Sequence, residues 1–157
     1  MHGELKMKAQ KIMTSNPHVC HPQDKVCQAL TIMKEYNCGV VPVTEGAEGT
    51  HLVGILTDRD IALKMCDEEK SCKDFNVESC MSKPVYFCHP YDDIQTVEQM
   101  MKQHKIHRIA VTDQNGQLQG IISLSDLARE AQSEKFGGSR ELPERELAEI
   151  IEEIDAL

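Results

Sequence analysis

The chain has 157 residues, of which 40% are hydrophobic, 27% charged and 4% aromatic. This length suffices for one ordinary domain, or for two very small units packed as one, without help from a metal or a disulfide. The formal net charge of −9 disfavours non-specific binding to nucleic acid or to membrane surfaces. Proteins with those activities need cationic patches for phosphate groups.

No apolar run approaches the ~20 residues that span a bilayer. The N-terminal Met1-His2-Gly3-Glu4 lacks the basic and apolar regions of a secretory signal. The chain has seven cysteines, an odd number, and no Cys-x-x-Cys. Because disulfide frameworks occur in exported chains, we expect free thiols and a cytoplasmic location.

The predicted elements run through the same order in each half of the chain. Each half begins with a short strand, which ends near Cys20 or Cys88. A helix follows, with apolar residues at the spacing of an amphipathic helix. These residues are Val26, Ala29, Leu30 and Met33, and then Ile94, Val97, Met100 and Met101.

Two further strands and a second helix complete each half. The strands are predicted over 40–43 and 52–56, and again over 108–111 and 118–122, with a Gly-containing turn inside each pair. The second helix starts at Thr57 or Ser123. The order is β-α-β-β-α twice, an α+β unit of about 55–60 residues that is too small to bury its own core well. Two units that share apolar faces solve this problem for both.

The order repeats because the sequence itself is duplicated. Cys20-His21-Pro22-x-Asp24 returns 68 positions later as Cys88-His89-Pro90-x-Asp92. Gly54-Ile55-Leu56-Thr57-x-x-Asp60 returns 66 positions later as Gly120-Ile121-Ile122-Ser123-x-x-Asp126. The two missing residues fall in the turn between the strands, where a repeat tolerates a change of length.

Over residues 9–132 this pattern resembles the cystathionine-β-synthase (CBS) domain family, as a tandem pair of CBS domains or Bateman module. The motifs are Met-Thr/Ser followed by Pro, the apolar strand around Val41-Pro42-Val43, and Gly-h-h-Thr/Ser-x-x-Asp before a helix. The second copy is similar to the nucleotide-sensing γ subunit of AMP-activated protein kinase. The resemblance implies adenine-containing ligands in clefts between paired repeats, no catalysis, and a two-fold homodimer.

The resemblance implies a stronger ligand site around Asp126, whose carboxylate accepts the two hydroxyls of a ribose. His107-Arg108 face the phosphate, because Arg can bind two phosphate oxygens at once. The adenine is expected in an apolar slot of the first copy. The implied residues are Thr14, Pro17, Val19, Cys38, Gly39, His107, Arg108, Ser123, Ser125 and Asp126.

A weaker site is implied around Asp60. Gly39-Val40 stand where the stronger site has His107-Arg108, so the weaker site lacks that pair of cations. We therefore expect a phosphorylated adenosine to bind more tightly at the Asp126 site. The implied residues are Thr57, Arg59, Asp60, Ser82, Val85, Phe87 and Ile106.

Both Asp motifs also have a purely structural interpretation. Thr57-x-x-Asp60 and Ser123-x-x-Asp126 are capping boxes, in which hydroxyl and carboxylate bond the free N–H groups at a helix start. The same N–H groups and the positive end of the helix dipole favour phosphate. The alternative for Arg108 is a solvated side chain at a strand edge.

Cys20-His21 and Cys88-His89 are of the residue types that bind zinc. Adjacent residues of a strand point to opposite faces, which disfavours chelation of one ion by either pair, and we assign no metal site. The methionines at helical spacing are predicted to be core residues. The sequence has no Gly-x-Ser-x-Gly, P-loop or Gly-x-Gly-x-x-Gly, so we expect no enzyme activity.

We divide the chain into residues 1–72 (first repeat with an N-terminal helix), 73–135 (second repeat) and 136–157 (linker and acidic tail). Residues 140–157 hold seven acids and two arginines, a net charge of −5. Leu147, Ile150, Ile151 and Ile154 form the apolar stripe of an amphipathic helix. This helix either packs back on its own module or docks on a second copy or a partner.

The sequence thus predicts a regulatory energy sensor that binds AMP, ADP or ATP, with or without magnesium, and has no obligatory cofactor. It signals to an unidentified effector protein by a change of conformation or association. Three alternatives stay open: a sensor of S-adenosylmethionine, a thiol- or metal-responsive protein, and a ligand-free dimeric adaptor.

Overall fold

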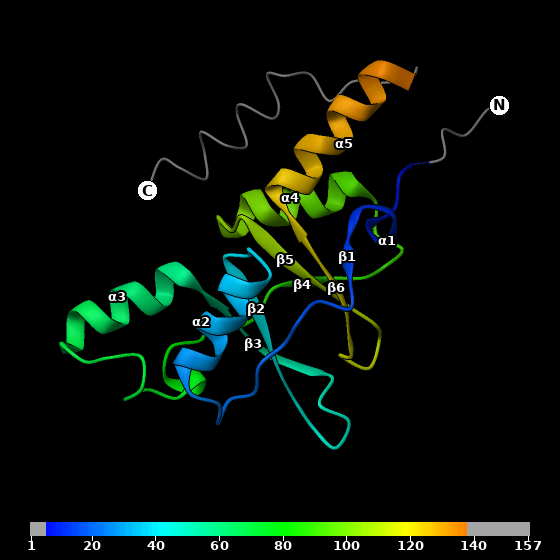
Figure 1. Cartoon of the computed structure of the whole chain (residues 1–157). Helices are drawn as coiled ribbons and strands as arrows, with labels where there is room; N and C mark the ends of the chain where they lie inside the picture. The colour runs from blue at the N-terminus through cyan, green and yellow to red at the C-terminus, as the bar shows by residue number, and fades with distance from the viewer. Residues whose placement is uncertain (1–5, 138–157) are drawn as a thin grey trace. The chain divides into compact units, whose positions relative to one another are not determined.

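The structure, a computed structural model, describes residues 6–137 (Figure 1). These residues form two compact units, and each unit takes chain from both repeats. Unit 1 comprises residues 6–15, 86–112 and 119–137, and unit 2 comprises residues 16–85 and 113–118. The boundary predicted at residue 72 divides the two sequence repeats rather than the two units, and it stays a prediction. The predicted helix within residues 140–157 lies outside the described residues.

Unit 1 is built on a four-stranded sheet in the order β1-β6-β5-β4. β1 is antiparallel to β6, with Thr14 opposite Ile121, and β4 is parallel to β5, with Phe87 opposite Ala110. The strands are β1 (Thr14–Ser15), β4 (Phe87–Cys88), β5 (Arg108–Thr112) and β6 (Leu118–Ser123), and the helices are α1 (Ala9–Ile12), α4 (Ile94–His104) and α5 (Leu124–Gly137).

Unit 2 has the same arrangement, made by the first repeat. β2 (Val40–Glu45) and β3 (His51–Thr57) pair antiparallel. Single bridges extend this pair on both sides: Cys20 is parallel to Val43, and Ser82 is antiparallel to Ile55. The order therefore matches that of unit 1. The helices are α2 (Val26–Glu35), α3 (Asp58–Glu68) and the short 3-10 helix η1 (Val77–Ser79).

The predicted α+β fold, with β-α-β-β-α twice, is confirmed apart from two details. The first short strand is reduced to the single bridge at Cys20, between Pro17 and Pro22, which lack the N–H that a ladder needs. Helix α5 continues through Gly137, so Phe136 and Gly137 belong to the helix rather than to the expected linker. Within residues 6–137, every helix is too short or too polar to cross a membrane.

The two cores use equivalent positions of the repeats. Val26, Met33 and Leu56 of unit 2 correspond to Ile94, Met101 and Ile122 of unit 1, and all six are buried. The correspondence extends to the short helices. Ala9, at the start of the chain, lies in the core with residues of the second repeat, and Val77 lies in the core with residues of the first. Both are 0% exposed. Each repeat is thus completed by the segment that leads into the other one.

A methionine follows each of these short helices and packs against a glycine of the sheet. Gly54 in β3 faces Met81, and Gly120 in β6 faces Met13. The three atoms nearest to a Cβ added at Gly54 all belong to the Met81 side chain. A Cβ added at Gly120 would also lie 2.8 Å from the carbonyl oxygen of Thr14. The two glycines therefore differ in what surrounds them.

We expect Gly120→Ala to lower the free energy of unfolding by about 2–3 kcal/mol, because the Thr14 backbone oxygen is held in the sheet by pairing with β6. Gly54→Ala should cost about 1 kcal/mol less, because a methionine side chain can change rotamer. Urea unfolding of the two variants measures the difference. An equal or larger loss for Gly54→Ala would contradict this account.

Candidate functional site

Asp60 and Asp126 are held in the same way at the start of a helix. In unit 1, Asp126 Oδ2 accepts hydrogen bonds from Ser123 N (2.8 Å) and Ser123 Oγ (2.7 Å), and Asp126 N donates to Ser123 Oγ (3.2 Å). In unit 2, Asp60 Oδ2 accepts from Thr57 N (3.1 Å) and Thr57 Oγ1 (2.6 Å), with the return bond at 3.1 Å. The structural interpretation of both motifs as capping boxes is therefore confirmed.

The two caps leave the second carboxylate oxygen in different surroundings. Asp126 Oδ1 lies 3.3 Å from Arg129 Nη1 in an ion pair. The Arg129 side chain is 75% exposed and that of Asp126 only 14%. The position equivalent to Arg129 in the first repeat is Leu63, so Asp60 lacks an arginine three residues further along its helix, although Arg59 precedes it in the first turn. An exposed arginine adds little stability and is easily displaced.

A backbone hydrogen bond ties each helix start to the start of a neighbouring strand. Leu124 N donates to His107 O (2.9 Å) in unit 1, and Asp58 N donates to Gly39 O (3.2 Å) in unit 2. These bonds place His107-Arg108 beside the cap of Asp126, and Gly39-Val40 beside the cap of Asp60. The predicted difference at the strand start is therefore present within the units themselves, while the cap of Asp60 has Arg59 in the first turn of α3, where unit 1 has Ser125.

The structure brings part of each predicted site together within one unit. In unit 1, Thr14 pairs with Ile121, two residues before Ser123, so that it lies near the cap of Asp126. In unit 2, Ser82 pairs with Ile55, two residues before Thr57. Every predicted site residue has an accessible surface; none of them is classed as buried.

Other predicted residues lie in one unit, while the carboxylate of their predicted site lies in the other. For the Asp126 site these residues are Pro17, Val19, Cys38 and Gly39, in unit 2. For the Asp60 site they are Phe87 and Ile106, in unit 1, while Val85 lies in unit 2 with Asp60. The assembly of each set into one pocket stays a prediction.

Cys20 and Cys88 occupy matching buried positions, each 1% exposed. Burial raises the pKa of each thiol from its ordinary value of 9.0 to about 12. The neighbouring histidine rings contact backbone carbonyl oxygens: His21 Nδ1 lies 2.7 Å from Thr44 O, and His89 Nδ1 lies 2.9 Å from Thr112 O. A buried, protonated thiol is a poor nucleophile and a poor metal ligand. Within residues 6–137, no three His, Cys, Asp or Glu residues are grouped to hold a metal ion.

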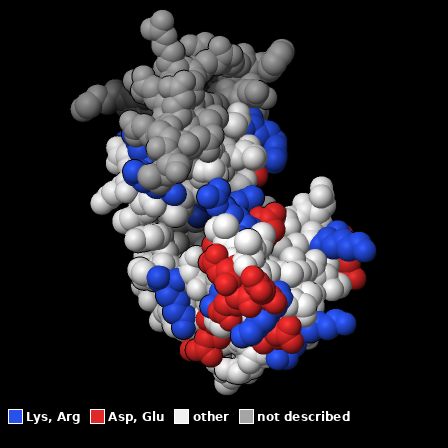
Figure 2. Space-filling view, turned by 90° about the vertical axis from the view of Figure 1, so that its left-hand side faces the viewer, with Lys and Arg blue, Asp and Glu red and all other residues white. Residues whose placement is uncertain are grey.

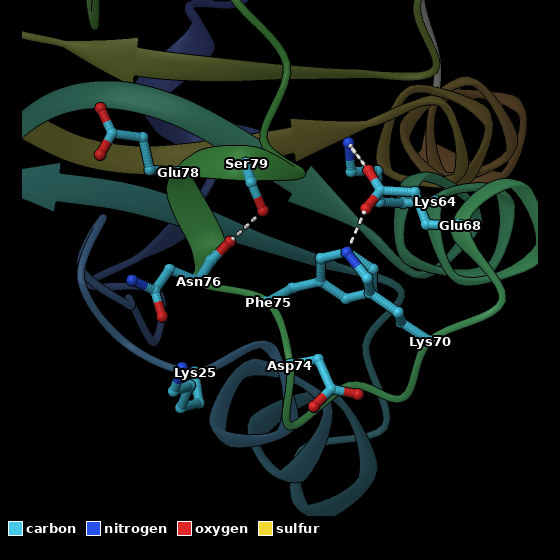
Figure 3. A pocket seen from close by; sticks show the side chains of 9 residues that line it. All are labelled: Lys25, Lys64, Glu68, Lys70, Asp74, Phe75, Asn76, Glu78 and Ser79. Atoms are coloured by element: carbon cyan, nitrogen blue, oxygen red, sulfur yellow. Dashed lines mark hydrogen bonds and ion pairs between the residues drawn. The ribbon is translucent and has the colours of Figure 1, made fainter.

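Sequence reasoning missed a cavity of about 400 Å³ in unit 2 (Figure 3). Two of its three lysines are paired: Glu68 bonds both Lys64 and Lys70, and these bonds lower the pKa of Glu68. Figure 2, which views the side where α3 lies, shows acidic and basic side chains intermixed. The Phe75 ring lies under the two lysines and is only 5% exposed. The lining residues are Lys25, Lys64, Glu68, Lys70, Asp74, Phe75, Asn76, Glu78 and Ser79.

Comparison with known proteins identifies the family. The sequence profile of the CBS domain matches residues 9–67 and 76–133, so the chain belongs to the CBS domain family and carries the domain twice. The CBS domain-containing protein YhcV of Bacillus subtilis (strain 168) is 35% identical over 127 residues, 81% of this chain and 87% of YhcV. Inosine-5'-monophosphate dehydrogenase of Streptococcus pyogenes is 27% identical over 117 residues, which are 73% of this chain but only 22% of the dehydrogenase.

Solved structures agree with this assignment. A conserved CBS domain protein of unknown function from Thermoplasma acidophilum is 26% identical, with a TM-score of 0.76 over 95% of this chain and 76% of that one. The CBS domain pair of MJ0100, in complex with 5'-methylthioadenosine and S-adenosyl-L-methionine, is 25% identical, with a TM-score of 0.69 over 78% and 98%. CBSX2 in complex with AMP shares the fold at 23% identity, with a TM-score of 0.69 over 82% and 98%.

We expect Cys20 and Cys88 to resist alkylation at pH 8 in the native protein, while the exposed Cys66 reacts readily. Because the thiols ionise near pH 9 when unfolded and near pH 12 when buried, the free energy of unfolding should fall as the pH rises from about 9 to 12. Mass spectrometry after iodoacetamide treatment, with and without urea, tests the first expectation. Rapid native labelling of Cys20 or Cys88 would contradict it.

Proposed function

We propose that this chain is a regulatory CBS pair that binds an adenosine nucleotide (AMP, ADP or ATP). It signals to a separate effector protein by a change of conformation or association. The proposal includes a cytoplasmic homodimer and no catalytic step. The observation that carries it is the pair of carboxylates, Asp60 and Asp126, each fixed by a hydroxyl and a backbone N–H at a helix start. Ligand complexes of a related CBS pair, MJ0100, support the choice of an adenosine ligand.

The cap leaves a chemically suitable acceptor for a ribose. Only one oxygen of Asp126, Oδ2, is used by Ser123, so the other oxygen, Oδ1, is available once the exposed Arg129 moves. A fixed carboxylate binds two neighbouring hydroxyls without losing side-chain entropy on binding, since the cap has already ordered it. The same argument applies to Asp60, whose Oδ2 is used by Thr57.

The cations at the two strand starts support the assignment of the tighter site to Asp126. His107-Arg108 lie beside the start of α5, where the helix dipole adds to their attraction for phosphate. Gly39-Val40 lie beside the start of α3 and supply no charged side chain. We therefore propose that the phosphates of the more tightly bound nucleotide lie near His107-Arg108.

Signalling follows from linkage: the nucleotide shifts a conformational or association equilibrium only by its difference in affinity between the two states. S-adenosylmethionine is a second candidate ligand, favoured by the MJ0100 complex. The burial and high pKa of Cys20 and Cys88 weigh against a thiol- or metal-responsive function. If no adenosine compound binds, the alternative function of a ligand-free dimeric adaptor is favoured instead.

Isothermal calorimetry with AMP, ADP, ATP, adenosine and S-adenosylmethionine, with and without magnesium, tests the proposal. We expect Asp126→Ala to weaken nucleotide binding by at least tenfold, the loss of a charge-assisted hydrogen bond of about 1.5–3 kcal/mol. Asp60→Ala should have a smaller effect on the tighter site. Equal losses in the two variants, or no loss in either, would contradict the assignment.

Ser123→Ala and Arg129→Ala are companion variants. Ser123→Ala removes the hydroxyl of the cap and keeps the carboxylate, so it measures how much the ordering of Asp126 contributes to binding. Arg129→Ala removes the competing cation, and binding should stay equal or become tighter. A thermal shift provides a second readout, because ligand at 100 times Kd adds about 2.7 kcal/mol to the free energy of unfolding.

A further inference from the structure

Helix α3 of unit 2 presents apolar side chains to solvent. Ile61, which is 2% exposed, marks the side of α3 that packs on the core. Because successive residues of a helix turn by about 100°, Leu63 and Cys66 point away from that side. Leu63 is 53% exposed, and its neighbours Ala62 and Cys66 are exposed as well. In Figure 1, α3 lies at the outer edge of unit 2. We call Ala62, Leu63 and Cys66 the α3 face.

The equivalent helix of unit 1 is polar at the same positions. By the 66-residue offset, Leu63 and Cys66 correspond to Arg129 and Gln132 of α5. The fold therefore does not require a large apolar side chain at this place. A single exposed leucine is ordinary on a protein surface, but here three neighbouring positions on the solvent side of one helix are apolar.

Opposite charges flank Leu63 on this helix. Arg59 lies four residues before Leu63 and Asp67 four residues after it, and both are exposed. Neither forms an ion pair of its own among residues 6–137. The two charges are separated by about 12 Å along the helix. Because they lie at equal distances from Leu63, the helix is complementary to a second copy of itself that runs antiparallel.

The size of the contact sets its strength. Two helices of 11 residues bury much less than the about 1,200–2,000 Å² of a stable interface. Unit 2 also holds seven Lys and Arg against twelve Asp and Glu, so two copies repel at long range, although salt screens this repulsion. We therefore expect a weak, reversible association, with the α3 face exposed when the protein is dilute.

We propose that the α3 helices of two copies pack antiparallel about a two-fold axis at Leu63, with an Arg59–Asp67 ion pair at each end. The inference rests on the homodimer of the proposed function and assigns its contact surface. The occupant is a second copy because one helix supplies both members of each ion pair and the apolar centre between them. A different protein would have to reproduce the same spacing of charges.

Sedimentation velocity of the full chain over a range of concentrations, without nucleotide, tests the apolar centre. We expect a monomer–dimer equilibrium in the native chain. Leu63→Arg gives α3 the residue of α5 and should weaken association by more than about tenfold, because each dimer loses two buried leucines and gains two facing cations. Tyr91→Ser in unit 1 removes a side chain that is more exposed, 72%, and is the control that should leave association unchanged.

A charge exchange tests the antiparallel register. Asp67→Arg turns both ion pairs into like-charge contacts and should weaken association about tenfold. Arg59→Asp in the same chain as Asp67→Arg re-forms both pairs with exchanged signs and should restore it. Both sites are exposed, and an acid at the start and a base at the end of a helix suit its dipole, so the fold should persist.

Cysteine chemistry provides a second readout. In a Cys66→Ser background, Leu63→Cys places two thiols at the two-fold axis, and diamide as the oxidant should join them in a disulfide-linked dimer. Arg129→Cys, the equivalent exposed position of unit 1, is the matched control and should stay monomeric. In the native chain, alkylation of Cys66 should be rapid in dilute protein and slower as the protein concentration rises.

The outcomes separate this contact from the rest of the proposed function. A native chain that stays monomeric at every concentration would overturn both the α3 contact and the proposed homodimer. A dimer that survives Leu63→Arg, or an Asp67→Arg defect that Arg59→Asp fails to restore, would overturn the α3 contact alone. Nucleotide binding is measured separately by calorimetry, so its failure is distinguishable from either result.

Discussion

The exchange of leading segments between the repeats is the constraint on which the rest of the structure depends. Neither repeat buries its own core: Ala9 completes the core of the second repeat and Val77 that of the first. Because both side chains are 0% exposed, removing either segment would leave a hole against a sheet. The same segments continue into Thr14 and Ser82, which pair with β6 and β3 close to the caps of Asp126 and Asp60. The segment that completes each core therefore also places a residue of each candidate site.

The capping boxes show how one group of atoms can serve stability and binding together. A cap uses Oδ2 of Asp60 or Asp126 and leaves the second oxygen for another donor. In unit 1 that donor is Arg129, an exposed side chain on the next turn of α5. Ordering the carboxylate costs the protein conformational entropy during folding rather than during ligand binding. The structural and the ligand-binding interpretations of this motif are thus compatible.

Local pattern predicted most of the fold. The spacing of Val26, Ala29 and Met33 identified a helix and its buried face, and Thr57-x-x-Asp60 identified the next helix start. The exchange of Ala9 and Val77 was not predictable, because periodicity reports which face of an element is buried and not what covers it. The ion pair of Asp126 and the cavity around Phe75 depend on side chains from separate turns or segments. For the same reason, the sequence named candidate site residues but not their distances.

The two repeats have matching backbones but different surface side chains, so the two units are not chemically equivalent. Lys6, Lys8 and Lys11 stand where unit 2 has Asp74, Asn76 and Ser79, and His107-Arg108 stand where it has Gly39-Val40. The core positions, in contrast, keep the same apolar character in both units. A perfectly symmetric pair would offer two equal sites, and one phosphorylated ligand would have no reason to prefer either. Under the proposed function, unequal cations on equal backbones make the preference between the two sites a matter of electrostatics, which salt can weaken while the fold stays intact.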